Sequence, residues 1–278
     1  MDKATWLITG ASSGFGYALA SVALRHGDQV VLAATALAPM QTLAADFPDS
    51  ALALEFDVTD AEQRTSVVRE AEARFGSIDI LVNNAGIDIL GAVEEQDEAD
   101  YRRLFEVNFF GPVAMLRLVL PGMRKLKKGT IVNMSSMDGI ASMAANGYYS
   151  ASKFALEGIT EALWQEIEPL GLRAVSVNPG SFRTGIGART KFSGKQIEAY
   201  SATSGAFRKA MAQLSDDMFP GDPSRAADVI FQSLKSDSTG RRIILGSDAY
   251  KIIAKKIESL RSENEAHEDL AQSTDFAT

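Results

Sequence analysis

The sequence predicts an α/β protein with one doubly wound domain, in which a seven-stranded parallel sheet has helices on both faces and a small lid insertion. Three observations support this prediction. Short β-rich runs alternate with longer helical patterns, the turns between them carry Gly, Asn, Asp and Pro, and no linker or repeat interrupts the alternation. A regular β-α-β order is typical of parallel sheets with right-handed crossovers.

Seven short runs are expected to be strands. Strands that helices cover on both faces need not alternate polar and apolar residues, and these runs are mostly apolar throughout. In chain order they are residues 6–8, 30–32, 51–54, 80–82, 130–132, 175–177 and 243–245.

Between these runs, apolar residues recur at i, i+3 and i+4, which is typical of helices that bury one face. Asp60 and Asp97 are expected N-caps, because a short acidic side chain can accept hydrogen bonds from the first free backbone N–H groups. The expected helices cover residues 14–26, 39–47, 60–75, 97–127, 148–170 and 223–235.

Two regions break the alternation. Residues 181–222 are polar, contain a helical stretch at 195–214 and lie between a strand end and a helix, which is the position of a lid. Residues 247–278 form an expected last helix followed by a polar, acidic segment from 261 that is expected to fray. Without a linker, residues 1–278 are interpreted as a single domain.

Composition excludes several classes of function. The 28 Lys and Arg against 36 Asp and Glu give a net charge of −8, which disfavours a nucleic-acid partner. With no Cys and with His26 and His267 far apart, no disulfide, thiolate nucleophile or metal site is expected. The start of the chain lacks the pattern of a signal peptide, and no apolar stretch reaches the ~18–20 residues of a membrane span. We therefore expect a cytoplasmic protein with no membrane partner.

A glycine-rich loop, Thr-Gly-Ala-Ser-Ser-Gly-Phe-Gly at residues 9–16, follows the first strand and opens the first helix. Gly10 permits a tight turn, Gly14 lets the backbone approach a pyrophosphate, and Gly16 lets helix and strand pack closely. The helix N-terminus then faces the negative charge. This strand–loop–helix context predicts a dinucleotide site of the Rossmann type, and the alternative is a purely structural turn.

The spacing Gly-x-x-x-Gly-x-Gly resembles the short-chain dehydrogenase/reductase family, and further motifs of that family occur in order between residue 4 and about residue 246. The chain is similar to the steroid- and retinol-dehydrogenase-like members. The motifs are Asp57-Val58, Asn83-Asn84-Ala85-Gly86, Asn108, Ser136, Tyr149-Ser150-Ala151-Ser152-Lys153 and Asn178-Pro179-Gly180 with Thr184.

The resemblance implies a nicotinamide dinucleotide cofactor, NAD or NADP, bound along the glycine-rich loop and the segments that follow later strands. The residues expected to bind it are Gly10, Ser12, Ser13, Gly14, Phe15, Gly16, Thr35, Asp57, Val58, Asn84, Ala85, Gly86, Tyr149, Lys153, Pro179, Gly180 and Thr184.

Tyr149 and Lys153 are four residues apart and so share one face of a helix. A phenol with a pKa near 10 is a poor acid at neutral pH, but a nearby ammonium stabilises the phenolate and lowers that pKa. Tyr149 is therefore the expected general acid or base. Tyr148 lies about 100° further around the helix and cannot share this face with Lys153.

Two further catalytic residues are implied by the resemblance. Ser136 is expected to polarise the substrate carbonyl, whereas Ser135 should point to the opposite face of the strand end. Asn108 is expected to hold a water that joins Lys153 to solvent, and the alternative is a buried amide with a backbone partner.

The implied reaction is direct hydride transfer between nicotinamide C4 and the carbonyl carbon of a ketone or secondary alcohol, without a metal. An apolar pocket favours a hydrophobic substrate, although its residues could instead belong to the core. The expected lining is Ile87, Ile89, Met137, Ile140, Met143, Phe182 and Ile186, with Asp88 and Asp138 as acidic exceptions.

The cofactor preference depends on the end of the second strand, where residues 32–37 read Leu-Ala-Ala-Thr-Ala-Leu. A carboxylate there would bind the ribose hydroxyls of NAD, and an Arg would attract the phosphate of NADP, but neither is present. The hydroxyls of Ser12, Ser13 and Thr35 can bind a phosphate, and no nearby acid repels it. NADP is therefore favoured over NAD.

Two rival functions fit the sequence less well. A catalytically idle sensor or scaffold that binds a dinucleotide would not require the acid–base set of Ser136, Tyr149 and Lys153. An epimerase or dehydratase of an extended relative would need a larger substrate domain than residues 247–278 provide. The resemblance also implies a homodimer or homotetramer formed through the helices at 97–127 and 148–170.

Overall fold

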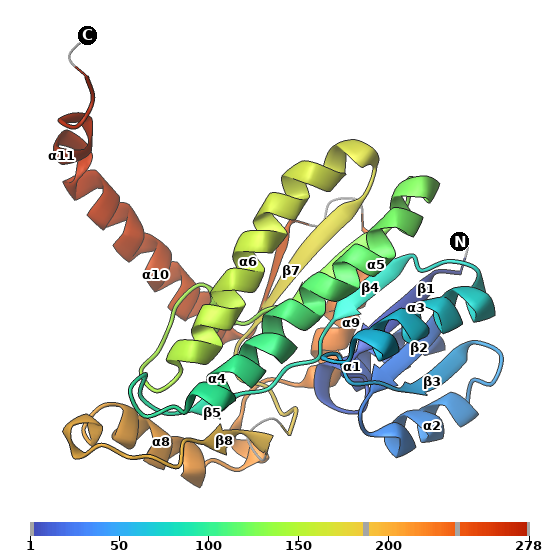
Figure 1. The fold of residues 1–278 in the computed structure, drawn as a ribbon, viewed down its shortest axis with the longest axis horizontal. Coiled ribbons are helices and arrows are strands. Elements are labelled where there is room, and N and C mark those ends of the chain that lie inside the picture. The colour runs from blue at the N-terminus through green and yellow to red at the C-terminus, as the bar shows by residue number, and fades with distance from the viewer. Residues whose placement is uncertain (1–2, 186–188, 237–239, 277–278) are drawn as a thin grey trace.

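Seven parallel strands form the central sheet of the computed structural model, which describes residues 3–185, 189–236 and 240–276 (Figure 1). The strand order is β3-β2-β1-β4-β6-β7-β9, so the chain reverses its direction of winding between β1 and β4. All seven expected strands and the doubly wound topology are confirmed. The strands are β1 (Thr5–Thr9), β2 (Gln29–Ala34), β3 (Ala51–Glu55), β4 (Ile80–Asn83), β6 (Thr130–Met134), β7 (Arg173–Pro179) and β9 (Arg242–Leu245).

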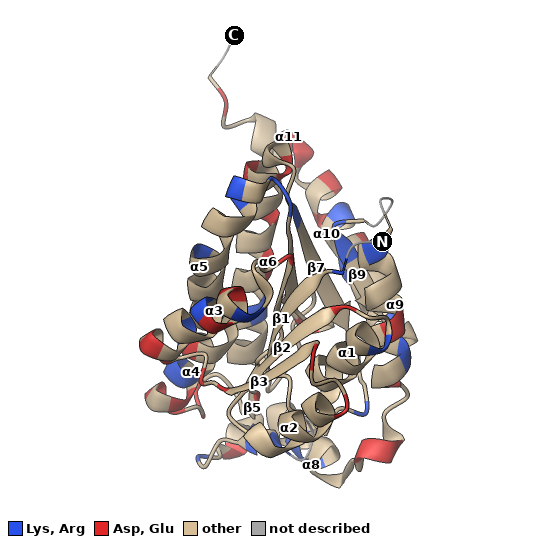
Figure 2. Ribbon diagram, turned by 90° about the vertical axis from the view of Figure 1, so that its right-hand side faces the viewer, with Lys and Arg blue, Asp and Glu red and all other residues tan. Residues whose placement is uncertain are grey.

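Helices cover both faces of this sheet, which Figure 2 shows nearly edge-on. Side chains of β1 alternate between the two layers, with Trp6 and Ile8 in one buried cluster and Leu7 in the other. The first layer contains α1 (Gly14–Arg25), α2 (Leu37–Ala45) and α9 (Pro223–Lys235), and the second contains α3 (Ala61–Phe75), α5 (Gly111–Leu126) and α6 (Gly147–Ile167), which ends in the short turn η3 (Glu168–Leu170).

One of the two expected N-caps is wrong in its detail. The Asp60 side chain accepts hydrogen bonds from the backbone N–H groups of Glu62 and Gln63, as expected. Asp97 stands at the N-cap of its helix, but its side chain makes no capping hydrogen bond. The cap of α3 is therefore predictable from residue type, whereas that of the helix after Asp97 is not.

The long helix expected at 97–127 has three parts: α4 (Glu98–Phe105), a π-helical turn η1 (Glu106–Phe110) and α5. Residues 98–126 include an 18-residue window with a mean hydropathy of 1.4, which by length and composition alone would suffice to cross a membrane. The sequence did not predict such a segment. Met115 and Val119 of this helix are buried in the core cluster beneath it, so packing on the sheet accounts for its apolar face.

The insertion expected at 181–222 forms a second small sheet with the segment after β4. Its helical part is shorter than predicted, because the chain turns between η4 and α8. Glu95 anchors the insertion, since this buried carboxylate accepts hydrogen bonds from the backbone of Ala92 and Ile197 and lies 3.4 Å from Arg208. The elements are β5 (Ile89–Leu90) paired with β8 (Lys191–Phe192), then η4 (Glu198–Tyr200), α8 (Ser204–Gln213) and η5 (Asp216–Met218).

The C-terminal segment is more ordered than the sequence predicts. The helix α10 (Ser247–Ala266) continues past residue 261, where fraying was expected, and α11 (Glu268–Gln272) follows it. Both extend away from the sheet (Figure 1). Ion pairs from Arg261 to Glu258 and Glu265, one turn away on either side, stabilise this exposed part of the helix.

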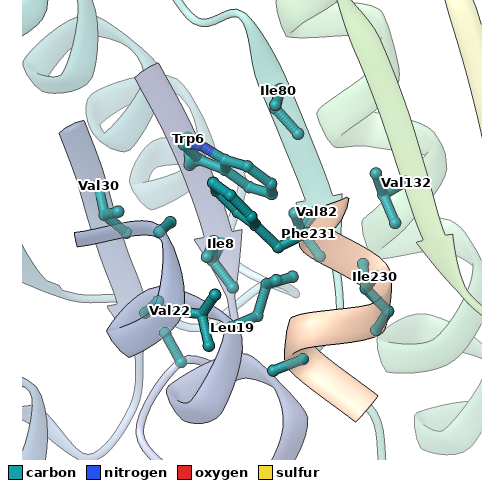
Figure 3. Packing of buried hydrophobic residues seen from close by; sticks show 14 of the residues in the cluster. Trp6, Ile8, Leu19, Val22, Val30, Ile80, Val82, Val132, Ile230 and Phe231 are labelled. Carbon is teal, nitrogen blue, oxygen red and sulfur yellow. The ribbon is translucent and has the colours of Figure 1, made fainter. Parts of the chain in front are cut away.

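A buried aspartate ties α9 to the sheet. Asp28 is 4% exposed and accepts hydrogen bonds from the Ala4 backbone at 3.0 Å and from the Trp6 indole at 2.9 Å. Its carboxylate also pairs with the Lys235 ammonium of α9 at 2.8 Å. Figure 3 shows the Trp6 ring next to Phe231 of the same helix, with ring centroids 5.8 Å apart.

We predict that Asp28→Ala lowers the free energy of unfolding by about 3 kcal/mol, because it leaves buried donors without an acceptor. Urea unfolding at neutral pH measures this change. The control is Asp49→Ala, which removes the same charge from an exposed position. Equal losses in the two variants would show that Asp28 has no anchoring role.

Candidate active site

The segments after four strands converge at the carboxyl edge of the sheet, where the winding reverses. Ligands of doubly wound sheets bind at this position. The Asn84 side chain, after β4, donates to the carbonyls of Thr9 and Gly10 after β1, at 2.9 and 3.0 Å. The Asn178 side chain in β7 donates to the Ser136 carbonyl after β6, at 3.1 Å. The predicted motifs therefore meet in one place.

Two glycines of the loop at 9–16 are required by close packing. Gly10 has a φ of +64°, and a Cβ there would lie 2.8 Å from the Ala85 Cα. A Cβ on Gly16 would lie 2.6 Å from the Gly10 carbonyl oxygen, as expected for close packing of helix and strand. Thr184 lies against Gly14, so the segment after β7 closes over the loop.

The start of α1 fits a pyrophosphate. Its N-cap residue Ser13 makes no side-chain capping hydrogen bond, and the first turn carries no acidic residue. The first backbone N–H groups of the helix therefore remain for a ligand with negative charge. Within the described residues, the half-buried hydroxyls of Ser12 and Ser13 make no hydrogen bond either.

The other predicted cofactor residues differ in whether their side chains are accessible to a ligand or already packed and hydrogen-bonded within the protein. Thr35 is exposed after the end of β2 and Gly86 after β4, and both are accessible. Val58 is buried in the core, Phe15 packs on Phe182 with ring centroids 5.0 Å apart, and the amide of Asn84 is used by the loop. Pro179 ends β7 and Gly180 follows it, while the Asp57 carboxylate accepts from the backbone and hydroxyl of Thr59.

The structure brings Ser136, Tyr149 and Lys153 together. The Ser136 side chain adjoins the Tyr149 phenol and lowers its pKa. The Lys153 ammonium lies 5.7 Å from the centre of the Tyr149 ring and donates to the Met134 carbonyl, at the end of β6, at 2.8 Å. This arrangement joins a hydroxyl, a phenol and a buried ammonium at one point.

The two rival side chains lie elsewhere. The Ser135 hydroxyl faces the backbone of the short turn η2 (Met137–Gly139), where a Cβ on Gly139 would lie 2.6 Å from it. Tyr148 stacks on Tyr101 of α4 with ring centroids 4.5 Å apart. The choices of Ser136 over Ser135 and of Tyr149 over Tyr148 therefore agree with the geometry.

Asn108 lies in the π-helical turn and is fully buried. Its amide oxygen accepts from the Ile87 backbone at 2.9 Å, and its amide nitrogen donates to the Ile87 carbonyl and the Ser152 hydroxyl. A Cβ on Gly86 would lie 3.5 Å from the Asn108 oxygen and 3.8 Å from the Lys153 nitrogen, so Asn108 adjoins the lysine. The backbone partner expected in the alternative interpretation is present.

Electrostatics at the site differ from the simple expectation of a lowered tyrosine pKa. Burial, and then the carboxylates of Asp88 and Asp138, raise the pKa of Tyr149 above its usual range. The hydrogen bond with Ser136 only partly offsets this rise. Burial lowers the pKa of Lys153 to about 8, against the opposing effects of Glu157 and Asp88. In the free protein, burial and the two carboxylates therefore keep the Tyr149 phenol protonated.

Sequence analysis missed Glu157, a buried carboxylate one helical turn after Lys153. It accepts hydrogen bonds from the Ser176 hydroxyl and, at 2.7 Å, from the Asn178 amide, and it pairs with Arg242 at 3.1 Å. Because Asn178 also holds the Ser136 carbonyl, Glu157 links the helix of Lys153 to the strand end of Ser136. The sequence signal was a charged residue on an apolar, buried face of a helix.

Most of the expected pocket residues belong to packed clusters, as in the alternative interpretation. A cavity of about 710 Å³ borders the start of α6, and its walls are formed by residues 92–94, residues 142–145, Gly147, Tyr200, Thr203 and Ser204. Of the expected lining residues that the structure describes, Met143 alone borders it. Met137, Ile140 and Met143 pack against Ala249 and Ile253 of α10, Ile87 and Phe182 pack in the core, Ile89 is buried in β5, and Ile186 lies outside the described residues.

Comparison with known proteins identifies the family of this chain. The family model for short chain dehydrogenases matches residues 4–194. Oxidoreductase BOA17 of Botryotinia fuckeliana is 31% identical over 96% of this chain and 97% of that protein. The 3-ketodihydrosphingosine reductase of Bacteroides thetaiotaomicron is 39% identical over 65% of this chain and 64% of that protein.

Solved structures give the same result. A short-chain dehydrogenase from Streptomyces avermitilis superposes with a TM-score of 0.92 at 40% identity, covering 99% of this chain and 100% of that one. A 3-ketoacyl-(acyl-carrier-protein) reductase from Brucella melitensis, complexed with NADH, matches with a TM-score of 0.72 at 26% identity, over 87% of this chain and 96% of that one. With its family match, its fold and its site in agreement, the chain belongs to the short-chain dehydrogenase family, as an NAD(P)-dependent oxidoreductase of ketones and alcohols.

Proposed function

We propose that this enzyme interconverts a hydrophobic ketone and its secondary alcohol, with NADP favoured over NAD and with Tyr149 as the general acid or base. The observation that carries the proposal is the meeting of the Ser136 hydroxyl, the Tyr149 phenol and the Lys153 ammonium. They meet at the sheet edge beside a helix start whose first turn has no side-chain cap. An idle sensor has no physical need for such an acid–base set.

Each proposed catalytic residue has a different role at the substrate oxygen. Ser136 holds this oxygen by a hydrogen bond, and Tyr149 gives it a proton in reduction and removes that proton in oxidation. A bound nicotinamide supplies or accepts the hydride. Lys153 stays mostly protonated at neutral pH, since its pKa is about 8, and its charge stabilises the phenolate that forms during reduction. Asn108 positions Gly86 and Ile87 beside Lys153 through its backbone hydrogen bonds.

One wall residue of the cavity is Gly147, two residues before Tyr149. Small and apolar side chains form most of the cavity wall, which favours a hydrophobic substrate. The Bacteroides relative is named for the reduction of a ketone. For the cofactor, support for NADP comes from the exposed Thr35 hydroxyl and from the hydroxyls of Ser12 and Ser13, which make no hydrogen bond to the described part of the chain. Ala34, the position of a carboxylate in an NAD site, is buried with the core.

We predict that Tyr149→Phe reduces kcat by at least ~100-fold, the lower end of a general-acid contribution, while cofactor binding persists. Turnover of a ketone panel with NADPH and fluorescence titration of NADPH measure the two effects. Tyr148→Phe is the matched control and should change kcat little, because this ring stacks on Tyr101. Equal losses in the two variants would remove Tyr149 from its proposed role.

Lys153→Met should weaken cofactor binding and slow turnover, because it removes the charge but keeps an apolar side chain of similar length. Without the ammonium the pKa of Tyr149 rises further, so the alkaline limb needed for alcohol oxidation should move to higher pH. The pH profile of kcat for the residual activity measures this shift. An unchanged profile would contradict the electrostatic role of Lys153.

Thr35→Arg should increase the preference for NADP by about tenfold, since a guanidinium adds charge-assisted hydrogen bonds to the phosphate. Values of kcat/KM with both cofactors measure the preference. The control Thr65→Arg adds the same charge on an exposed part of α3. A wild-type preference for NAD of more than ~100-fold, or about 2.7 kcal/mol, would contradict the NADP assignment.

A further inference from the structure

Two carboxylates face the catalytic residues, and the reaction described above uses neither. Asp88 follows Gly86 and Ile87 in the segment that enters β5, and Asp138 lies in the turn η2, two residues after Ser136. Both act electrostatically on the Tyr149 hydroxyl and on each other. A carboxylate pair beside a tyrosine that must ionise opposes the chemistry unless another group balances it.

Asp138 is the more buried of the two, at 5% exposure. One carboxylate oxygen accepts from the Asn146 amide at 2.9 Å, and its backbone N–H donates to the Ser136 hydroxyl at 3.1 Å. The other carboxylate oxygen is buried and has no partner within the described residues. The free oxygen therefore belongs to a carboxylate that adjoins Ser136 and raises the pKa of Tyr149.

Asp88 is half-buried and is held by the insertion. The Ile89 backbone and the Thr190 side chain act on this carboxylate and lower its pKa, while the Asp88 backbone carbonyl accepts a hydrogen bond from the Lys191 N–H at 3.2 Å. One carboxylate oxygen is again buried without a partner in the described part of the chain. The pairing of β5 with β8 therefore fixes the segment that carries this second free acceptor.

The cationic side chains around the site do not supply enough positive charge to pair with both Asp88 and Asp138. Among the residues that the structure describes, Lys153 is the ammonium that acts on Asp88, and its nitrogen already donates to the Met134 carbonyl. The charge of Arg242 is taken by Glu157 and Glu161. Leaving buried carboxylate oxygens unpaired costs free energy, so a bound cation with N–H donors would complete this pair.

We propose that Asp88 and Asp138 bind an ammonium group of the substrate, so that the substrate is a hydrophobic ketone or alcohol that also carries an amine near the reacting carbon. This inference rests on the proposed function. An ammonium offers three donors, which can reach both free oxygens and form charge-assisted hydrogen bonds. The site therefore distinguishes amino ketones from neutral ketones of the same shape.

The bound amine also affects the chemistry. A positive charge between the two carboxylates cancels their effect on Tyr149, whose pKa they otherwise raise. A neutral substrate leaves that effect in place. The amine should therefore improve kcat for alcohol oxidation as well as KM.

The pH dependence follows from the groups that face the pair. These are Tyr149 and Lys153 of α6, Ser136 before η2, Asn146 before α6 and Thr190 of the insertion, while the face of α10 packed on η2 is apolar. Burial raises the pKa of Asp138 to about 7 and that of Asp88 to about 6. Protonation removes the negative charges below these values, so selectivity for the cation should fall as pH drops from 8 to 5.5.

Matched substrate pairs test the proposal directly. In oxidation, 2-amino-1-phenylethanol is compared with 1-phenylpropan-1-ol, which has a methyl group in place of the ammonium. In reduction, 3-amino-1-phenylpropan-1-one is compared with 1-phenylbutan-1-one. We expect kcat/KM with the NADP couple at pH 8 to favour the cation by at least ~10-fold, or 1.4 kcal/mol, in one or both pairs.

Isosteric variants assign the effect to the pair. Asp138→Asn and Asp88→Asn should each lower kcat/KM for the amine and raise it for the neutral partner, so the ratio falls at least ~10-fold in each. The control Asp228→Asn removes the same charge from an exposed site on α9 and should keep the wild-type ratio. Thermal unfolding checks that each variant is folded, and either aspartate variant alone suffices for the test.

The outcomes separate the two proposals. If wild-type enzyme turns over the neutral substrates as well as the amines, or if both aspartate variants keep the wild-type ratio, the ammonium site is refuted and the proposed function stands. If Asp138→Asn lowers kcat/KM equally for both members of a pair, Asp138 only positions Asn146 and the inference is wrong. If the wild type transfers no hydride to any ketone of a broader panel, the proposed function itself fails.

Discussion

The active site is organised around a buried ammonium. Lys153 is 4% exposed, and a charge in that position requires acceptors from the protein. The Met134 carbonyl at the end of β6 supplies one at 2.8 Å, which fixes α6 against the strand that leads to Ser136. Because Tyr149 lies one helical turn before Lys153, the same contact places the phenol beside the Ser136 hydroxyl.

The buried Glu157 extends this constraint through the fold. Through Asn178 it connects α6 to β7 and to the Ser136 carbonyl, and through Arg242 it reaches β9. The Ser136 carbonyl and the helix that carries Tyr149 are therefore joined by a polar network that spans α6, β7 and β9. A site positioned in this way is rigid on one side, while the insertion held by Glu95 forms the other side.

Local patterns in the sequence predicted the seven strands, the layers and the meeting of Ser136, Tyr149 and Lys153, because each depends on spacing along one element or on ordered motifs. The helix past residue 261 and the π-helical turn around Asn108 were not predictable in this way. Neither was the raised pKa of Tyr149, since Asp88 and Asp138 reach it from segments distant in the chain. Most of the expected pocket residues pack in apolar clusters, and the sequence alone does not separate the two roles, because apolar residues serve cores and pockets alike.

The central claim is that this site transfers a hydride directly between the nicotinamide and a carbonyl carbon. The most direct measurement uses NADPH with deuterium at both C4 positions, a hydrophobic ketone and ordinary water, followed by NMR of the alcohol. The account predicts one deuterium on the carbinol carbon of each product molecule. Alcohol that carries hydrogen from water at that carbon would contradict it.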